Sequence, residues 1–307
     1  MFPNGAEFCL SLRPAVEMCT NFPYGTSQWN LLKGALDANS KQYVLKMHEV
    51  ARSYNVHLYC LLVGSSFEDP DIDYLKELVA AGHEVGNHTY THLNVKAKTV
   101  ESLQAVYASA PWLANGRTPL QIIHDEVRAT KAAIRERLGV TVTGFGTPGA
   151  FSTGLHDVPE VQALLKEEGF THVTSHYLHP ALRGAKRPPL AQLEAAMRKN
   201  IDKLQPYRYP NGLLEVAPMA LTDIAAFRVL DLDRWEYVRL LKTAIDHAHA
   251  NRYILSLAFH PPAMAVRDPH CDVLDTVIRY ALEKPGGCWI ATNSAIASYF
   301  ESREAIG

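Results

Sequence analysis

Short apolar stretches alternate with amphipathic helical patterns along most of this chain of 307 residues. Residues 56–63 are mostly apolar, as in a strand that is buried on both faces of a parallel sheet. The apolar residues between Lys41 and Tyr54 recur at helical spacing instead. A strand followed by a helix, repeated along the chain, predicts an α/β fold, and we expect a distorted (β/α) barrel of about seven parallel strands.

Two long segments interrupt this alternation, at about 93–117 and 178–212. Segments of this kind at the catalytic face of a barrel usually shape access to the substrate. The chain shows no internal repeat and no linker, so we expect residues 1–307 to form a single domain. The patterns predict strands at 7–12, 56–63, 83–87, 140–145, 171–175, 213–216, 253–259 and 288–291, and helices at 41–54, 71–81, 118–138, 158–168, 233–250 and 272–284.

The overall composition is that of a soluble globular protein, with 47% hydrophobic and 20% charged residues. A net charge of -2 and the lack of a basic aromatic groove argue against a nucleic-acid partner. No apolar run is long enough for a membrane helix, and the N-terminus does not have the pattern of a signal peptide. The five cysteines are odd in number and widely scattered, which favours a reduced compartment. We therefore expect a cytoplasmic protein with no membrane partner.

Two histidines four residues apart, His88 and His92, follow the predicted strand at 83–87. Imidazole is the commonest protein metal ligand, and this spacing on a helical turn lets both side chains face one ion. The same spacing occurs at His172 and His176, so it needs a supporting context before it indicates a metal site.

The context of the first pair resembles the second motif of the polysaccharide deacetylases, which share the NodB-homology fold of carbohydrate esterase family 4. Residues 82–92 read GHEVGNHTYTH. Residues 144–151 (GFGTPGAF) look like the third motif of that family. Residues 252–262 (RYILSLAFHPP) resemble its last motif, in which a histidine after an apolar strand, here His260, is the general acid. The order and spacing of the three motifs agree with the family over most of the chain.

The resemblance implies a hydrolase that removes acetyl groups from an amino sugar or an acetylated glycan. It implies a divalent metal ion, most often zinc, held by His88, His92 and a carboxylate. Such an ion polarises the acetyl carbonyl and makes its bound water more acidic, a base takes the water proton, and His260 protonates the leaving group. The substrate is then a carbohydrate or a related small molecule.

The first motif departs from the family, whose first strand ends in two aspartates, one acting as base and the other as metal ligand. Residues 8–14 read FCLSLRP instead. If Ser11 and Leu12 align with the residues before the acidic pair, Arg13 and Pro14 occupy the two catalytic positions. Neither residue can act as a base or supply a carboxylate.

The third motif departs as well, because Gly146 stands where the family has an arginine that orients the base. One hypothesis joins the two departures: the guanidinium of Arg13 fills the space at Gly146. In the alternative, the alignment of the first strand is shifted and Glu17, just past the strand, supplies the missing carboxylate as base and metal ligand. Asp37 is a weaker candidate for that carboxylate.

Further candidate residues lie near the ends of predicted elements. Thr147, Pro148 and His176 are candidates for substrate contacts at the carboxyl ends of strands. Trp112, Tyr207 and Tyr209 are candidates for stacking on a sugar ring or for packing anchors. Trp112 and segment 93–117 also offer an interface for a homo-oligomer. Arg13 is a candidate to contact an anionic group of the substrate, or else to form a buried ion pair.

Three functional hypotheses therefore stay open. The first is a metal-dependent deacetylase with a rearranged first motif. The second is a metal-free hydrolase of a small cyclic amide, as in the allantoinase-like branch of the same fold, which would depend on Arg13 and His260. The third is a catalytically silent relative that binds glycans.

Overall fold

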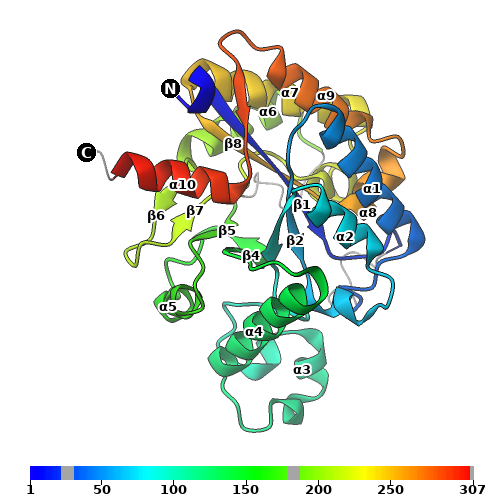
Figure 1. The fold of residues 1–307 in the computed structure, drawn as a ribbon, viewed down its shortest axis with the longest axis vertical. Helices are drawn as coiled ribbons and strands as arrows, with labels where there is room; N and C mark the ends of the chain where they lie inside the picture. Colours follow the sequence, from blue (N-terminus) through cyan, green and yellow to red (C-terminus); the bar gives the residue numbers. More distant parts are fainter. Residues whose placement is uncertain (22–30, 179–186, 305–307) are drawn as a thin grey trace.

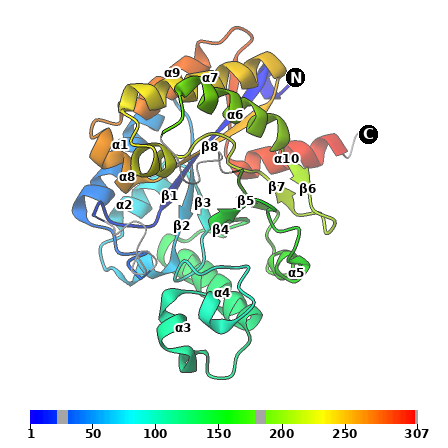
Figure 2. The same ribbon diagram turned by 180° about the vertical axis from the view of Figure 1, so that it is seen from behind.

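A computed structural model of the protein describes residues 1–21, 31–178 and 187–304. Within these residues, nine strands form one curled sheet in the order β6-β7-β5-β4-β3-β2-β1-β8, and β9 pairs with β1. The recorded pairings are parallel, except that of β6 with β7. Figures 1 and 2 show the helices around the outside of this sheet, with α3 and α4 projecting at one end. The predicted α/β class and the distorted barrel are confirmed.

Most helices and strands lie close to the predicted ranges, and the structure contains several that the sequence patterns do not predict. The strands are β1 (Phe8–Val16), β2 (Tyr59–Leu62), β3 (Glu84–Asn87), β4 (Gly144–Phe151), β5 (His172–His176), β6 (Tyr207–Arg208), β7 (Leu214–Glu215), β8 (Ile254–Phe259) and β9 (Cys288–Ile290). The helices are α1 (Ala38–Ser53), α2 (Asp73–Ala80), α3 (Ala105–Ser109), α4 (Pro119–Leu138), α5 (Pro159–Glu167), α6 (Leu190–Lys203), α7 (Arg234–Asn251), α8 (Pro261–Arg267), α9 (Asp272–Leu282) and α10 (Asn293–Glu304).

The first strand, β1, is longer at its carboxyl end than the sequence predicts. It continues through Pro14 to Val16, although proline cannot donate to a β-ladder. β2 and β8 flank β1 on opposite sides, and Pro14 stands where the pairing with β8 ends, one residue before the pairing with β2 begins at Ala15. The next residue, Glu17, is therefore the one that stands at the carboxyl end of β1.

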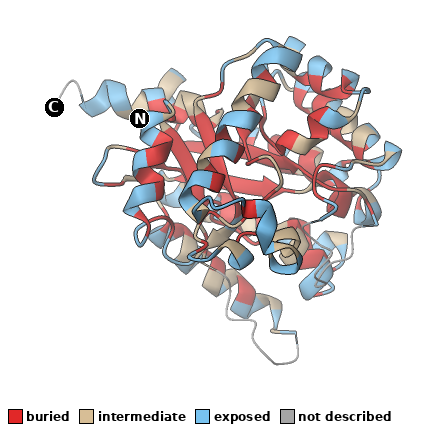
Figure 3. Ribbon diagram, turned by 90° about the horizontal axis from the view of Figure 1, so that it is seen from below, coloured by how far each residue is buried: buried red, intermediate tan, exposed pale blue. Residues whose placement is uncertain are grey.

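The two faces of β1 carry different side chains. Leu10, Leu12 and Val16 pack into the main apolar core outside the sheet, whereas Arg13 and Ala15 face the interior of the barrel. A strand alternates its side chains with a period of two residues, so Glu17 continues the interior row. Figure 3 shows the buried sheet inside a shell of half-buried and exposed helices.

Both interrupting segments contain regular structure. Segment 93–117 holds α3 and two short 3₁₀ helices, and Figure 1 shows α3 beside α4 at the projecting end. Segment 178–212 holds the helix α6 and the strand β6, while its residues 179–186 lie outside the described residues. Among the described helices, none has the length and the apolar character that crossing a membrane requires. All five cysteines are free thiols.

A buried histidine cluster makes the stability of the fold depend on pH. The Nδ1 atom of His83 accepts a hydrogen bond from the backbone N–H of Leu58 at 3.0 Å, and its Nε2 atom lies 2.9 Å from Nδ1 of His48. Burial, with the neighbouring His48 and His57, lowers the pKa of His83 to about 4. A proton on Nδ1 would break the bond to Leu58, so the folded protein keeps His83 neutral.

We expect the free energy of unfolding to fall as the pH decreases from about 6.5 to about 4. In that window the unfolded chain protonates this histidine and the folded chain does not, which costs about 1.4 kcal/mol for each pH unit. The variant His83→Gln should lack this part of the pH dependence. Denaturant titrations of both proteins at a series of pH values measure the difference, and parallel pH profiles would contradict the assignment.

Candidate active site

A cavity of about 250 Å³ opens at the carboxyl ends of the strands, where parallel barrels carry their reactive groups. Its apolar wall consists mainly of small residues such as Ala15, Ala150 and Ala258. The charged and histidine side chains that line it are Arg13, Glu17, Lys33, His88, His92 and His260. The structure thus gathers the interior end of β1 and the predicted histidines around one space.

Glu17, His88 and His92 form the centre of this group. The Oε2 atom of Glu17 lies 2.9 Å from Nε2 of His88 and 3.2 Å from Nε2 of His92. The two imidazole rings meet edge to face, with their centroids 5.0 Å apart. All three side chains are buried, and one ligand atom from each lies within 4.8 Å of the others.

The two histidines converge through an irregular turn after β3, and not through the helical turn that their spacing suggested. Thr89 and His92 both adopt the left-handed conformation, with φ of 58° and 60°. This conformation is strained for a residue with a branched side chain such as threonine. Hydrogen bonds hold it: the N–H of Thr89 donates to Asn87 Oδ1 at 2.9 Å, and the Thr89 hydroxyl accepts from the N–H of Leu93 at 3.2 Å.

The hydrogen bond on the far side of His88 fixes its tautomer. Its Nδ1 atom lies 2.8 Å from the carbonyl oxygen of Gly146, which can only accept, so Nδ1 carries a proton. The Nε2 atom then faces the Glu17 carboxylate directly. A lone pair and a carboxylate oxygen repel each other at 2.9 Å, so a proton or a bound cation belongs between them.

Lys33 is a second cation on the same carboxylate. Its Nζ atom forms an ion pair with Oε1 of Glu17, and both side chains are at most 3% exposed. The segment that carries Lys33 is held against β1, because the N–H of Gly34 donates to the Glu17 carbonyl oxygen at 2.7 Å. Gly34 has φ of 90°, and a Cβ atom there would lie 2.0 Å from the hydroxyl oxygen of Ser65. Only glycine allows this approach.

The charges around Glu17 determine its ionisation. Burial by itself would raise the pKa of Glu17, but Lys33, His92 and the close contacts with the two histidines hold it well below its usual value. Burial and the ammonium of Lys33 lower the pKa of His92 to about 3, although Glu17 acts in the opposite direction. At neutral pH the site therefore holds a carboxylate and a neutral His92, which are the forms that bind a metal ion.

His260 lies on the opposite side of Glu17 and is held by a buried aspartate. Its Nδ1 atom donates to Oδ1 of Asp223 at 2.7 Å, and its backbone N–H donates to Oδ2 at 2.5 Å. Asp223 is fully buried. This pair leaves Nε2 of His260 directed to the cavity, 3.8 Å from Oε1 of Glu17.

The space at Gly146 is occupied by Leu61. A Cβ atom at Gly146 would lie 2.1 Å from Cδ1 of Leu61, which is fully buried in the barrel. The hypothesis that Arg13 fills this space is therefore wrong. The alternative agrees with the geometry, because Glu17 is the carboxylate that stands beside the two histidines. Asp37 instead caps α1, accepting from the N–H of Ser40 at 2.8 Å.

Among the other candidates, Thr147 lines the cavity, with its hydroxyl donating to the Gly149 carbonyl oxygen at 2.6 Å. Pro148 is buried beside the cavity and does not line it. Trp112 lies after α3, is 73% exposed and does not line the cavity, so its contact with a sugar ring stays a prediction.

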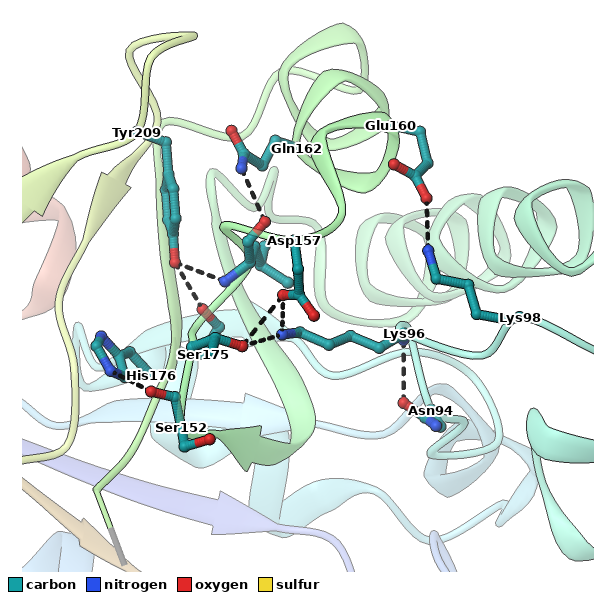
Figure 4. A network of polar contacts seen from close by, with 12 residues as sticks. Asn94, Lys96, Lys98, Ser152, Asp157, Glu160, Gln162, Ser175, His176 and Tyr209 are labelled. Carbon is teal, nitrogen blue, oxygen red and sulfur yellow. Dashed lines mark hydrogen bonds and ion pairs between the residues drawn. The ribbon is translucent and has the colours of Figure 1, made fainter.

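The aromatic and histidine residues near β5 form a packing network beside the cavity. The hydroxyl of Tyr209 donates to Glu215 at 3.0 Å, and Tyr209 is buried. His176 contacts the hydroxyl of Tyr207 at 3.1 Å. It also contacts the carbonyl oxygen of Ser152 at 2.9 Å (Figure 4). None of these side chains lines the cavity, so the candidate contacts of His176, Tyr207 and Tyr209 with substrate stay predictions. His172, the partner of His176 in the second pair, is fully buried near Glu84.

The residues present fit a divalent metal ion. Two imidazole nitrogens and one carboxylate oxygen are the donor set of many catalytic zinc sites. Because Nδ1 of His88 carries the proton, its Nε2 atom has a lone pair that can bind a metal ion. The Oε2 atom of Glu17 faces the two histidines and accepts no hydrogen bond from another group. Lys33 pairs with the other oxygen of Glu17, so it does not block this donor set.

Comparisons with known proteins show similarity in sequence over part of the chain and in fold over nearly all of it. Residues 35–171 match the family model described as polysaccharide deacetylase. The fold is similar to that of a putative polysaccharide deacetylase from Mycobacterium smegmatis, with a TM-score of 0.67 and 16% identity over 99% of this chain and 93% of that one. It is also similar to a probable polysaccharide deacetylase from Pseudomonas aeruginosa PAO1, with a TM-score of 0.67 and 16% identity over 98% and 93% of the two chains.

A third solved structure, of Puue allantoinase, has a TM-score of 0.66 and 17% identity over 98% of this chain and 92% of that one. At these identities the likeness to solved structures shows the fold. No curated protein matches the sequence.

Proposed function

We propose that the chain is a divergent member of the polysaccharide deacetylase family and a hydrolase that removes an acetyl group from an amino sugar or acetylated glycan. Family membership implies hydrolysis of carbon–nitrogen bonds other than peptide bonds. The observation that carries the proposal is the placement of Glu17, His88, His92 and His260 around one cavity.

In this proposal Glu17, His88 and His92 would hold a divalent metal ion, and their donor set of one oxygen and two nitrogens suits zinc. The ion, when bound, polarises an acetyl carbonyl and makes water more acidic. Glu17 therefore takes the role of the metal-binding aspartate of the family from a position just past β1. Lys33 pairs with the second oxygen of Glu17 and so orients the carboxylate.

His260 is the group that we propose moves protons. Arg13 stays protonated at any relevant pH, and Lys33 is engaged with Glu17, so neither is suited to accept a proton from water. The Nε2 atom of His260 faces the cavity, while Asp223 holds Nδ1 and stabilises the imidazolium that forms. His260 thus takes the proton of the attacking water at Nε2 and donates it to the leaving nitrogen.

A metal-free hydrolase of a small cyclic amide is the second candidate. The observation that favours it is the ion pair of Lys33 with Glu17, because it places a built-in cation on the carboxylate that would bind the metal. In that case Glu17 is the base, and Lys33 orients it.

Acetate release from N-acetylated amino sugars, measured before and after chelation, tests the proposal and separates the two candidates. We expect the rate of acetate release to fall by about 100-fold after treatment with a strong chelator, because the site would lose the ion that polarises the acetyl carbonyl. The rate should return when zinc is added. Hydrolysis of cyclic amides that survives chelation would favour the second candidate. A lack of acetate release from a broad panel by the zinc-loaded protein would contradict the first.

A further inference from the structure

Arg13 is a buried cation without a partner among the described residues. The residue is 8% exposed, its guanidinium lines the cavity, and its Nε atom makes no hydrogen bond. Desolvating a charge costs several kcal/mol unless a counter-charge or hydrogen bonds offset it. The cost at Arg13 is not offset by any recorded ion pair or hydrogen bond from the side chain.

The three acidic residues whose charges act on Arg13 are each bonded to other groups. Glu17 pairs with Lys33, and Asp223 holds His260. Glu215 accepts hydrogen bonds from the hydroxyls of Ser175 and Tyr209, at 2.5 and 3.0 Å. The field of these groups reaches Arg13, but none lies within ion-pair distance of it. Among the described residues no acidic side chain forms an ion pair with Arg13, so its guanidinium can take an anion that enters the cavity.

A second unpartnered polar group lines the same cavity. The hydroxyl of Thr174 on β5 is buried and makes no hydrogen bond. Arg13 lies two interior positions before Glu17 on β1, which places its backbone about 13 Å further into the barrel at about 3.3 Å for each residue. The floor of the cavity thus carries a cation and a hydroxyl, and its rim carries the proposed catalytic group.

The size of the cavity restricts what can reach this floor. Pockets for drug-sized ligands measure about 300–1,000 Å³. A cavity of about 250 Å³ takes a small molecule or one sugar unit. The planar fork of a guanidinium matches a carboxylate, to which it can donate two parallel hydrogen bonds.

We propose that Arg13 and Thr174 bind a carboxylate group of the substrate, so that the preferred substrate is a small N-acetylated compound with a carboxylate, such as an N-acetylated amino sugar acid. This inference rests on the proposed function and names the substrate class of that same site. Arg13 is here a residue that determines specificity, and the acyl group to be removed lies toward Glu17 and His260.

The test compares binding of two sugars that differ in one group. The probes are 2-acetamido-2-deoxyglucuronic acid and N-acetylglucosamine, in which a carboxylate replaces a hydroxymethyl group. Calorimetric titration of the wild-type protein should give a dissociation constant about 10- to 100-fold lower for the acid, as expected for hydrogen bonds between charged groups. The variant Arg13→Met should bind both sugars with nearly equal affinity.

Two further variants serve as controls. Arg128→Met changes an exposed arginine outside the cavity and should keep the wild-type preference. Arg13→Lys keeps the charge but lacks the planar guanidinium, so it should lose most of the preference for the acid. This variant replaces Arg13→Met in the test if Arg13→Met does not fold. Equal binding of the two sugars by the wild-type protein overturns the inference, as does displacement of the acid by inorganic phosphate at lower concentration than by acetate.

The outcomes also separate this inference from the proposed function. Acetate release from the neutral sugar without any preference for the acid overturns the role of Arg13 and leaves the hydrolase in place. A strong preference for the acid without acetate release from any compound supports the role of Arg13 and contradicts the deacetylase.

Discussion

Replacing Glu17 with glutamine should lower acetate release by about 1,000-fold or more, because it removes the carboxylate that serves as the proposed metal ligand. The same change should lower the free energy of unfolding by about 3–5 kcal/mol, since it leaves the buried ammonium of Lys33 without its counter-charge. Acetate assays and denaturant titrations of the purified variant measure the two effects.

A double variant separates these two effects. Glu17→Gln combined with Lys33→Met removes both charges and should recover most of the stability while activity stays low. Glu84→Gln is a matched control, because it neutralises another largely buried carboxylate, paired with His172 outside the cavity, and should keep activity near the wild-type level. Wild-type activity in Glu17→Gln would rule out the assigned role of Glu17.

Replacing His260 with alanine should lower kcat by about 10² to 10⁴, the usual contribution of a general acid or base. Asp223 positions His260 through its Nδ1 atom and its backbone N–H. Asp223→Asn should therefore lower kcat with little change in KM, because the asparagine can no longer stabilise the imidazolium. Steady-state kinetics with a saturating range of substrate measure both constants.

The control for this pair is His270→Ala, which removes an exposed histidine that follows α8 and should not change kcat. Partial recovery in Asp223→Glu would support a positioning role, since the longer carboxylate can still accept from Nδ1. An equal rise of KM in Asp223→Asn and His260→Ala, without loss of kcat, would instead indicate that the pair serves only to bind substrate.

The sequence predicts the fold better than it predicts the first motif. Apolar periodicity locates most strands and helices because buried faces must repeat every two or every 3.6 residues. Pro14 is the reason that β1 appears to end too early, since proline rarely continues inside a sheet. The pairing of β1 with β2 at Ala15 and Val16, beyond Pro14, is a tertiary feature that local patterns do not contain.

The same limit applies to the site. His88, His92 and His260 stand next to recognisable motifs, and Glu17 could be named because it follows the strand. Lys33 and Asp223 were not predicted, because one lies on an irregular segment before α1 and the other follows β7 without any motif around it. One signal in the sequence was available for Lys33: the glycine after it, Gly34, marks a position with positive φ close to other backbone.

The role of Trp112 is open for a different reason. An aromatic residue in a long segment of a barrel can serve the substrate or the packing, and sequence patterns do not distinguish the two. Trp112 lies in the 3₁₀ helix Pro111–Ala114, is 73% exposed and does not line the cavity, which leaves both roles as predictions.

Metal content of the purified protein after zinc loading and dialysis tests most directly whether Glu17 completes the site with His88 and His92. We expect about one zinc ion for each wild-type chain, as in catalytic sites with three protein ligands, and almost none in Glu17→Gln. Wild-type protein that retains no zinc, or a Glu17→Gln variant that retains as much as the wild type, would contradict the account.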